Sequence, residues 1–270
     1  MAEHPRVEAD PNNPGAWMVR LGHADHSYVD PDRPDLLLFD YVQRIADAVD
    51  AFAPEGQRIR VVHIGGAGMT LPRYVATTRP TSAQIVLEPD VELIEEVRAT
   101  IPLPRHSGIK VRPIDGRAGI AAMPDDYADV VIVDAFSGTQ VPAELTTVGF
   151  FGDLRRVLRP DGMAIVNLTD HRDLRYTRRV LAGARMLWRH VLLSAEPGTL
   201  KGKRFGNLLV FASATGLPEQ TLQRKAASAA FPYRIVAGKH LDRFVGHAAP
   251  FSDAAPEPSP EPPNGSTSWF

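Results

Sequence analysis

The sequence predicts an α/β protein: a three-layer αβα sandwich around a mostly parallel, seven-stranded sheet. Short runs of β-branched and apolar residues alternate along the chain with stretches whose apolar residues recur at helical spacing. Several of these runs stop at Gly, Pro or Asp, which punctuate strands. The run at 128–134, ADVVIVD, is almost continuously apolar, as expected for a strand that is buried on both faces of a parallel sheet.

Each predicted element rests on one of these two patterns. One helical stretch opens on Asp90, a residue type that caps helix N-termini, and another is stopped by Pro160. Parallel strands joined by helices form right-handed crossovers, and ligands bind beyond the carboxyl ends of such strands. We expect strands at 58–64, 83–88, 109–114, 128–134, 163–168, 190–196 and 206–213, and helices at 90–101, 146–160 and 173–189.

The pattern divides the chain into four parts. Residues 58–248 hold the alternating strands and helices, and residues 16–57 are expected to add an N-terminal extension of a strand and a helix. Residues 1–15 are rich in Pro, Asn and charge, and residues 249–270 are rich in Pro, Ser and Glu. Such compositions bury little apolar surface, so both ends are predicted to be disordered tails.

Composition and charge exclude several functions. The 270 residues carry a formal net charge of -2, so no basic field draws the chain to nucleic acid or to an anionic membrane. There is no Cys, and the nine His residues show no close ligand spacing, so no metal site is expected. No apolar stretch approaches the roughly 20 residues of a membrane span, and no signal-peptide core is present. A soluble, cytoplasmic protein is predicted.

A glycine-rich turn follows the first strand of the predicted sheet. VVHIGGAGMTLPRY (61–74) places Gly65, Gly66, Ala67 and Gly68 between the strand and a possible helix. Glycines let the backbone approach a ligand, and the N–H groups of the next helix point at it. A β-to-α turn of any kind also favours glycine, so the turn alone leaves both interpretations open. It lacks a full GxGxxG and any lysine, which disfavours dinucleotide and P-loop sites.

Acidic residues stand at three further strand ends. Glu88 lies about 20 residues past the glycines, where an acid can accept hydrogen bonds from both ribose hydroxyls. The third strand ends at Asp115-Gly116, and the most apolar strand ends at Asp134, which could take a proton from an amine. Taken singly, Glu88 could be a solvated residue and Asp134 a turn cap. The joint pattern predicts nucleoside binding.

These residues carry a family resemblance over about residues 16–215. The supporting stretches are DHSYVDPDRPDLLLFDYVQRIAD, VVHIGGAGMTLPRYV, IVLEPDVELIEEVR, PIDGRAGI, DVVIVDAFSGTQVPAELTT and LRPDGMAIVNLTD. Together they resemble the spermidine synthase (polyamine aminopropyltransferase) family, a branch of the Rossmann-like class I S-adenosylmethionine-dependent methyltransferase fold. The resemblance implies that 58–248 is a nucleoside-binding domain. It also implies a transferase of polyamine biosynthesis that is commonly a homodimer.

The resemblance implies a role for each nucleoside-site residue. The turn from Gly65 to Gly68 would hold the methionine-derived part of decarboxylated S-adenosylmethionine or methylthioadenosine. Glu88 would bind the ribose, and Asp115 and Gly116 would meet the adenine. The family turn typically reads GGGDGG, and its aspartate neutralises the amino end of the co-substrate; Gly68 occupies that place here.

The resemblance also implies roles on the acceptor side. Asp134 would accept the proton as an amine attacks the carbon next to the sulfonium, and Tyr41 would line the amine pocket. The family loop typically reads DSSDP, whereas this chain has DAFSG, so that Ser137 replaces the second aspartate. His26 stands where the family has a glutamine. A dication would therefore meet fewer carboxylates in this chain than in the family.

The sequence thus predicts a spermidine synthase-like protein that binds an S-adenosyl nucleoside and transfers an aminopropyl group to a small-molecule amine. Decarboxylated S-adenosylmethionine or S-adenosylmethionine would be the co-substrate, and no metal is expected. Two alternatives stay open: a methyltransferase that uses S-adenosylmethionine, and a catalytically silent nucleoside-binding protein.

Overall fold

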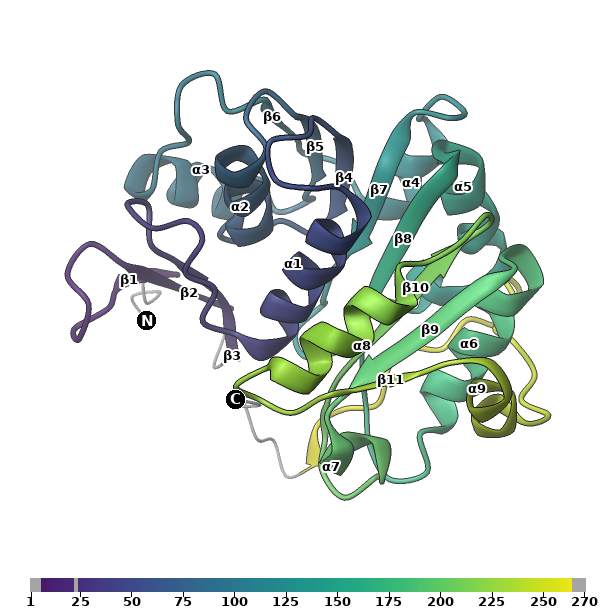
Figure 1. The fold of residues 1–270 in the computed structure, drawn as a ribbon. Helices are drawn as coiled ribbons and strands as arrows, with labels where there is room; N and C mark the ends of the chain where they lie inside the picture. The colour runs from purple at the N-terminus through teal and green to yellow at the C-terminus, as the bar shows by residue number, and fades with distance from the viewer. Residues whose placement is uncertain (1–5, 22–23, 264–270) are drawn as a thin grey trace.

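A large, twisted β-sheet with helices on both faces forms the centre of the molecule in a computed structural model, which describes residues 6–21 and 24–263 (Figure 1). The predicted α/β class is confirmed. Within the described residues the sheet has eight strands, in the order β11-β9-β10-β8-β7-β4-β5-β6. Its strands are β4 (Arg60–Ile64), β5 (Ala83–Leu87), β6 (Ile109–Arg112), β7 (Ala128–Val133), β8 (Leu158–Asp170), β9 (His190–Ala195), β10 (Gly206–Ser213) and β11 (Arg234–Val236).

Five neighbouring strands, from β6 to β8, run parallel, and β10, β9 and β11 continue the sheet in antiparallel pairs. The register aligns the carboxyl ends of the central strands, because Ile64 of β4 pairs with both Leu87 of β5 and Val133 of β7. The residues that follow, Gly65, Glu88 and Asp134, therefore start from one edge of the sheet.

Two apolar clusters, one on each face of the sheet, make up the core. Helices α1, α2 and α8 supply buried residues to one cluster, and α4, α5, α6 and α9 supply them to the other. Burying these faces removes apolar area from water, which is the dominant favourable contribution to folding. The helices are α1 (Asp40–Phe52), α2 (Thr70–Thr78), α3 (Val91–Thr100), α4 (Gly116–Ala121), α5 (Val148–Val157), α6 (Arg175–Leu187), α7 (Pro197–Leu200), α8 (Glu219–Ser228), α9 (Gly238–Val245) and the short 3-10 helix η1 (Ala143–Thr146).

All seven predicted strands are present, and the structure adds an eighth, β11, at the sheet edge. β11 has only three residues, too few to show a strand pattern in the sequence. The predicted N-cap is confirmed, because the Asp90 carboxylate accepts a hydrogen bond from the Leu93 N–H at 2.8 Å. The predicted helix at 146–160 is shorter: α5 ends at Val157, and Pro160 already lies in β8.

A small antiparallel sheet forms the N-terminal part of the described chain. Its strands are β1 (Val7–Ala9), β2 (Trp17–Leu21) and β3 (Ala24–Val29). Buried valines from all three strands pack with α3 in a third apolar cluster. The prediction of a disordered 1–15 tail is therefore wrong for residues 6–15, since β1 pairs with β2 and Arg6 bonds Glu96. Residues 1–5 lie outside the described part.

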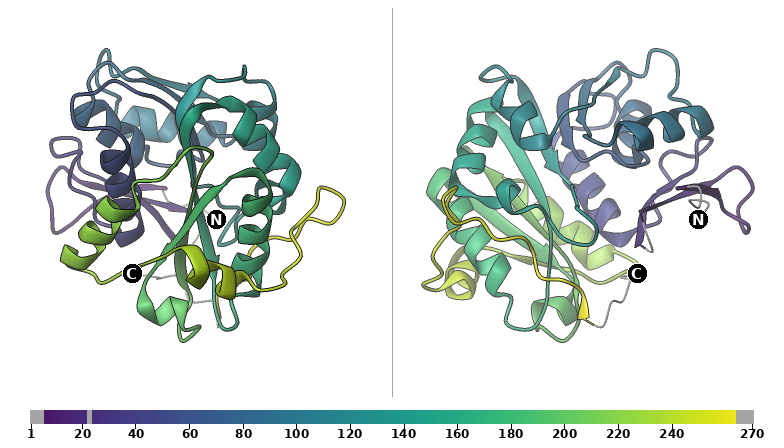
Figure 2. Two further views of the ribbon diagram at one scale, coloured as in Figure 1. Left: turned by 45° about the vertical axis from the view of Figure 1, so that its right-hand side comes forward. Right: turned by 180° about the vertical axis from the view of Figure 1, so that it is seen from behind.

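The other predicted tail is also ordered where the structure describes it. Residues 249–263, which we call the C-terminal strap, run along the α5–α6 side of the molecule (Figure 2). Phe251 is 1% exposed and lies under the Arg179 guanidinium, 3.9 Å from its ring centroid. Ser259 is fully buried. The disorder prediction is thus wrong for 249–263, because these two residues dock the strap on the rest of the molecule; 264–270 lie outside the described residues.

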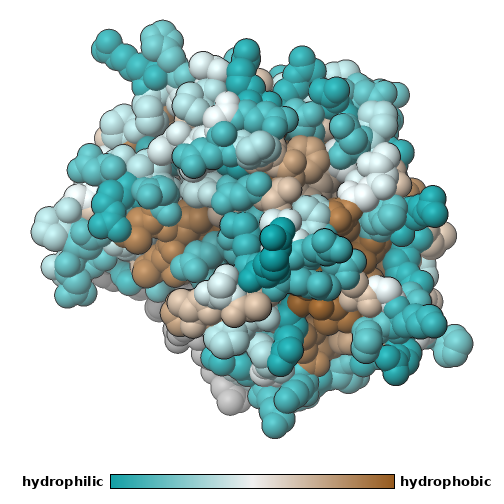
Figure 3. Space-filling model, viewed as in Figure 1, coloured by the Kyte–Doolittle hydropathy of each residue, from teal (hydrophilic) through white to brown (hydrophobic). Residues whose placement is uncertain are grey.

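Polar residues cover most of the face drawn in Figure 3, with separate hydrophobic areas between them. Within residues 6–21 and 24–263, no helix is long and apolar enough to cross a lipid bilayer.

Docking of the strap predicts a stability effect. Phe251→Ala should lower the free energy of unfolding by about 3–5 kcal/mol, because it empties a filled aromatic site at the end of the hydrophobic core. Urea unfolding measures the change. Phe231→Ala is the matched control, since Phe231 is 57% exposed, and its effect should stay within about 0.5 kcal/mol. Equal effects of the two variants would show that the strap is not packed.

Candidate functional site

The glycine turn after β4 is held against the end of β7. Gly65 has a φ of +84°, and a Cβ atom there would lie 2.2 Å from the Asp134 carbonyl oxygen. Only glycine fits this approach without moving the backbone. The Asp134 N–H donates to the Ile64 carbonyl at 2.9 Å, and the Gly65 N–H donates to the Leu87 carbonyl at 2.9 Å. The turn and Asp134 are therefore fixed relative to each other by the backbone.

Two non-glycine residues of the same turn adopt left-handed backbone angles. Ala67 has a φ of 28° and Met69 a φ of 60°, and Met69 is buried at the N-terminus of α2. Such conformations cost roughly 1 kcal/mol or more each and persist where surrounding structure enforces them. Here Glu88 enforces the turn: its Oε2 accepts from the Gly66 N–H at 2.9 Å and the Ala67 N–H at 3.4 Å.

Gly68 lies under the N-terminal sheet. Its N–H donates to the Ser27 Oγ at 3.1 Å. A Cβ at this position would lie 2.8 Å from the Ser27 Cβ, 2.9 Å from Val29 Cγ2 and 3.0 Å from Val19 Cγ2. The absence of a side chain at Gly68 thus lets strands β2 and β3 close over the turn. Side chains of β2 and β3 thus occupy the space that an aspartate at position 68 would need.

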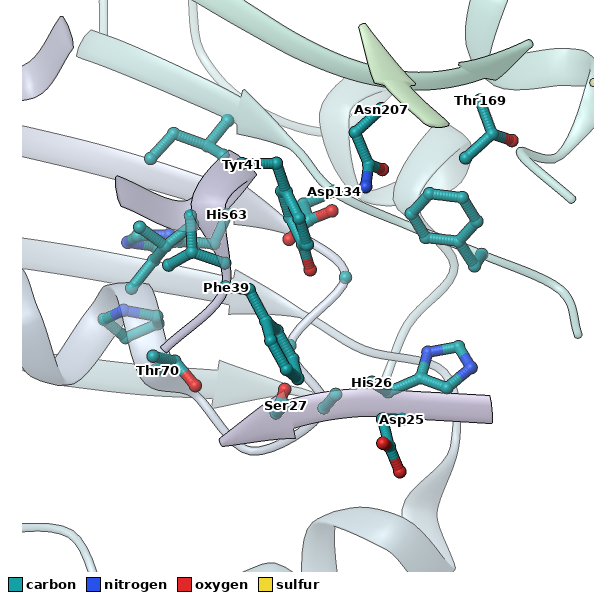
Figure 4. A pocket seen from close by; sticks show the side chains of 18 of the residues that line it. Asp25, His26, Ser27, Phe39, Tyr41, His63, Thr70, Asp134, Thr169 and Asn207 are labelled. Atoms are coloured by element: carbon teal, nitrogen blue, oxygen red, sulfur yellow. The ribbon is translucent and has the colours of Figure 1, made fainter. Parts of the chain in front are cut away.

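Asp134 lines a cavity between the sheet edge and the N-terminal segment (Figure 4). Its side chain is largely buried, and part of the surface that stays accessible faces the cavity. Burial raises the pKa of the Asp134 carboxyl to about 6, although the hydrogen bond from Asn167 Nδ2 to Oδ1 (2.9 Å) acts to lower it. The carboxyl therefore titrates just below neutral pH, where a general base works well.

Aromatic rings form much of the cavity wall. Tyr41, the second residue of α1, is 7% exposed, and burial together with the nearby Asp134 charge raises its pKa well above the usual value. Its ring stacks on Phe39, with centroids 6.2 Å apart. Tyr41, Asp134 and Asn207 line the same cavity, and His26 projects into it from β3 (Figure 4). Ring faces of this kind attract cations.

His26 connects β3 to the loop that follows Asp134. Its ring contacts Phe136 edge-on at 6.4 Å and makes a hydrogen bond with the Gly138 backbone. Burial lowers the pKa of His26, so the ring is neutral at pH 7. Its Nε2 is buried and has no hydrogen-bond partner among the described residues.

The C-terminal strap holds the far end of the same loop. Ser259 Oγ accepts from the Val141 N–H at 2.9 Å and lies 3.0 Å from Thr169 Oγ1. The Ser259 N–H donates to the Val141 carbonyl at 3.2 Å, and Gln140 Nε2 donates to the Ser259 carbonyl. Thr169 itself lines the cavity. The loop 135–141 is therefore anchored at one end by His26 and at the other by the strap.

The structure divides the predicted residues between two places. The cavity is lined by the acceptor-side and turn residues, but other predicted residues lie outside its lining: Gly68, Glu88, Asp115, Gly116 and Ser137. Asp115 caps α4 through the Ala118 N–H at 3.0 Å, and Gly116 packs against Ile64. Ser137 is exposed and pairs with Gln140. The cavity residues are His26, Tyr41, Gly65, Gly66, Ala67 and Asp134.

Sequence reasoning missed several polar residues of the site. His63 is 2% exposed, bonds Gln84 through Nε2 at 2.9 Å, and burial lowers its pKa to about 4. Asn167 holds Asp134, while Thr169 and Asn207 face each other on β8 and β10. The available signal was a polar residue inside an apolar strand, as in RVVHI and MAIVNL. Among the described residues, no three His, Asp or Glu side chains cluster to hold a metal ion.

An aspartate at position 68, as in the family turn, should destabilise the folded protein. Gly68→Asp should lower the free energy of unfolding by at least about 1–3 kcal/mol, since its Cβ overlaps the β2–β3 side chains and its charge enters a buried site. Gly152→Asp is the control, because nothing lies within 4 Å of a Cβ there. Chemical unfolding of both variants measures the difference. A Gly68→Asp variant as stable as the control would contradict the packing over the turn.

Because the pKa of Asp134 is raised, replacing this residue should increase the free energy of unfolding by an amount that depends on pH. The unfolded carboxyl releases its proton near pH 3.8, whereas the folded one keeps it to about pH 6, so the native state loses stability as pH rises between these values. Asp134→Asn should raise the free energy of unfolding by about 1–3 kcal/mol at pH 8 and by little at pH 4. Asp125→Asn, at an exposed ion pair, is the control. Equal effects of Asp134→Asn at both pH values would refute the raised pKa.

Known proteins share this fold and parts of this sequence. No protein-family model matches the sequence. A polyamine aminopropyltransferase from Vibrio vulnificus is 28% identical over 222 residues, which cover 77% of this chain and 68% of that protein. One from Chromobacterium violaceum is 28% identical over 108 residues, so that match spans only 41% of that relative's length.

Solved structures extend the likeness to nearly the whole chain. The human methyltransferase-like protein 13 in complex with SAH is 20% identical, with a TM-score of 0.57 over 80% of this chain and 96% of that one. A spermidine synthase in complex with the transition state analogue AdoDATO is 15% identical, with a TM-score of 0.56 over 92% and 77%. Both show the fold alone. A probable spermidine synthase from Corynebacterium glutamicum is 30% identical, with a TM-score of 0.84 over 92% of each chain. This chain therefore belongs to the spermidine synthase family.

Proposed function

We propose that the protein transfers the aminopropyl group of decarboxylated S-adenosylmethionine to a small-molecule amine. The observation that carries the proposal is the Asp134 carboxyl, which is enclosed between the glycine turn and the aromatic wall and has a pKa of about 6. The family supports the reaction class. The relative from Vibrio vulnificus is named as a polyamine aminopropyltransferase, and a buried carboxyl lining the cavity suits the proton acceptor of that reaction.

The nucleoside would bind at the ends of β4, β5 and β6. Glu88 is half-buried, and its two oxygens accept three backbone hydrogen bonds, from Gly66, Ala67 and Asp90. A carboxylate offers about four acceptor sites, so Glu88 can still accept from a ribose hydroxyl. Asp115 caps α4, the helix that follows β6 in the chain. The SAH bound to human methyltransferase-like protein 13 supports this class of ligand.

The reaction would proceed by direct displacement. The acceptor nitrogen forms a bond to the aminopropyl carbon next to the sulfonium, the C–S bond breaks, and methylthioadenosine leaves with the electron pair. The nitrogen's proton passes to the Asp134 carboxylate. Asn167 bonds Oδ1 and so orients the carboxylate. Holding both substrates in line supplies most of the acceleration, and the base adds roughly 100-fold.

The cavity walls suit cationic reactants. The stacked Phe39 and Tyr41 rings offer π-faces to the sulfonium or to the acceptor ammonium, each contact being worth about 0.5–2 kcal/mol. His63 and His26 are both neutral at pH 7, because burial lowers both pKa values, so they add no positive charge to the cavity.

Ligand binding and product formation test the proposal. Methylthioadenosine and decarboxylated S-adenosylmethionine should each raise the melting temperature, and S-adenosylmethionine should do so less. A preference for S-adenosylmethionine would instead support methyl transfer. Methyl transfer is the second candidate because Gly68 stands where the family turn has its aspartate. No response to any of the three would exclude a nucleoside site and with it the proposed function.

The role of Asp134 makes a separate kinetic prediction. Asp134→Asn should lower methylthioadenosine release roughly 100-fold while nucleoside affinity stays within about threefold. The wild-type kcat/KM should rise through pH 6 as the carboxyl loses its proton. Chromatographic quantification of methylthioadenosine between pH 5 and 8 measures both effects. Asp125→Asn, at an exposed ion pair, is the control; an Asp134→Asn variant that turns over normally removes Asp134 from the mechanism.

A further inference from the structure

A second cavity lies beside the cavity that contains Asp134. Asn207 of β10 lines both, so the two are neighbours on one edge of the sheet. The second has a volume of about 290 Å³. Its wall combines exposed apolar side chains, Leu38 and Phe231, with four charged ones: Asp40, Arg44, Glu196 and Arg204. An acceptor whose reacting nitrogen meets Asp134 would extend into this space.

Arg44 is the buried charge of this second cavity. Its side chain is 3% exposed, and it reaches the Ser194 carbonyl at 3.3 Å and the Asn207 carbonyl at 3.4 Å. These contacts lie at the long end of hydrogen-bond distances. Its Nε has no hydrogen-bond partner among the described residues. A buried guanidinium with an unused donor is costly unless a ligand completes its partners.

Both carboxylates of this cavity are already paired. Asp40 lies 3.3 Å from Arg44, and Glu196 lies 3.3 Å from Arg204. In the first cavity, Asp25 pairs with Arg20 at 2.6 Å, which leaves Asp134 as the unpaired carboxylate for the reacting nitrogen. The far ammonium of a diamine would therefore find no uncommitted carboxylate in either lining, whereas the Arg44 guanidinium, although paired with Asp40, still has a donor without a partner.

We propose that the second cavity is an outer acceptor subsite in which Arg44 selects amines that carry an anionic group, such as a carboxylate, at the far end. This assignment rests on the proposed aminopropyl transfer and specifies its acceptor. A carboxylate accepts from the Arg44 guanidinium, which lines the cavity, while Leu38 and Phe231 cover the methylene chain between the two ends. Burial also lowers the pKa of Arg44, which a bound anion would raise again.

Three amines with the same four-carbon skeleton test the subsite: 4-aminobutyrate, 1,4-diaminobutane and n-butylamine. They differ at the fourth carbon, which is a carboxylate, an aminomethylene group or a methyl group, so that the far end is anionic, cationic or neutral. Isothermal titration into the protein saturated with methylthioadenosine should show 4-aminobutyrate binding at least tenfold tighter than the other two. With decarboxylated S-adenosylmethionine as donor, kcat/KM should follow the same order. Equal or tighter binding of 1,4-diaminobutane would overturn the proposal.

Two substitutions assign the preference to Arg44. Arg44→Gln should abolish the tenfold selectivity, whereas Arg185→Gln, at a half-exposed ion pair elsewhere, should keep it. Asp40→Asn covers the case in which Arg44→Gln does not fold. It frees the Arg44 guanidinium and should strengthen 4-aminobutyrate binding two- to tenfold, whereas a cation subsite would lose affinity for 1,4-diaminobutane. Two results would refute the subsite: an Arg44→Gln variant that keeps the selectivity, or an Asp40→Asn variant that loses affinity for 1,4-diaminobutane.

The outcomes separate this proposal from the proposed function. Methylthioadenosine release with 1,4-diaminobutane as the preferred acceptor would support aminopropyl transfer and refute the anionic subsite. If methylthioadenosine does not bind, the proposed function fails, and the same three titrations on the free protein still decide what Arg44 recognises. Failure of all three amines to bind in both conditions would refute the subsite.

Discussion

The close approach of Gly65 to the backbone of Asp134 is the constraint on which the site depends. It brings the turn after β4 against the end of β7, so that one rigid piece of backbone carries both the predicted nucleoside turn and the candidate base. Everything else is arranged around that piece. Glu88 fixes the turn from β5, Asn167 orients the carboxylate from β8, and β3 closes over the top. A side chain at position 65 would separate all of them.

Much of this arrangement follows from the sequence, because parallel strands put the residues after them on one edge. Glu88 and Asp134 could be located in this way. Asp115 was located at the right strand end, but its carboxylate caps a helix, and a spacing pattern cannot distinguish a cap from a ligand contact. His63 and Asn167 were missed because a single polar residue barely alters an apolar strand pattern.

The strap was mispredicted for a different physical reason. Composition rules estimate whether a segment can bury enough apolar surface by itself, and residues 249–263 cannot. The segment is ordered by Phe251 and Ser259, which find partners in α6 and in the loop after β7. Such order depends on tertiary contacts between residues far apart in the chain, 118 positions for Val141 and Ser259, which no local pattern contains. The same holds for Arg44, whose burial becomes visible only once β9 and β10 lie beside α1.

Ser259 also has a consequence for how the molecule matures. The loop after Asp134 emerges from the ribosome more than a hundred residues before the serine that anchors it, since Val141 and Ser259 are 118 positions apart. A nascent chain can pair its central strands early, but the loop after Asp134 stays unanchored until synthesis reaches the strap. Contacts of such long range also slow folding. A ribosome-bound intermediate would therefore have a complete sheet and an unfinished cavity at Asp134.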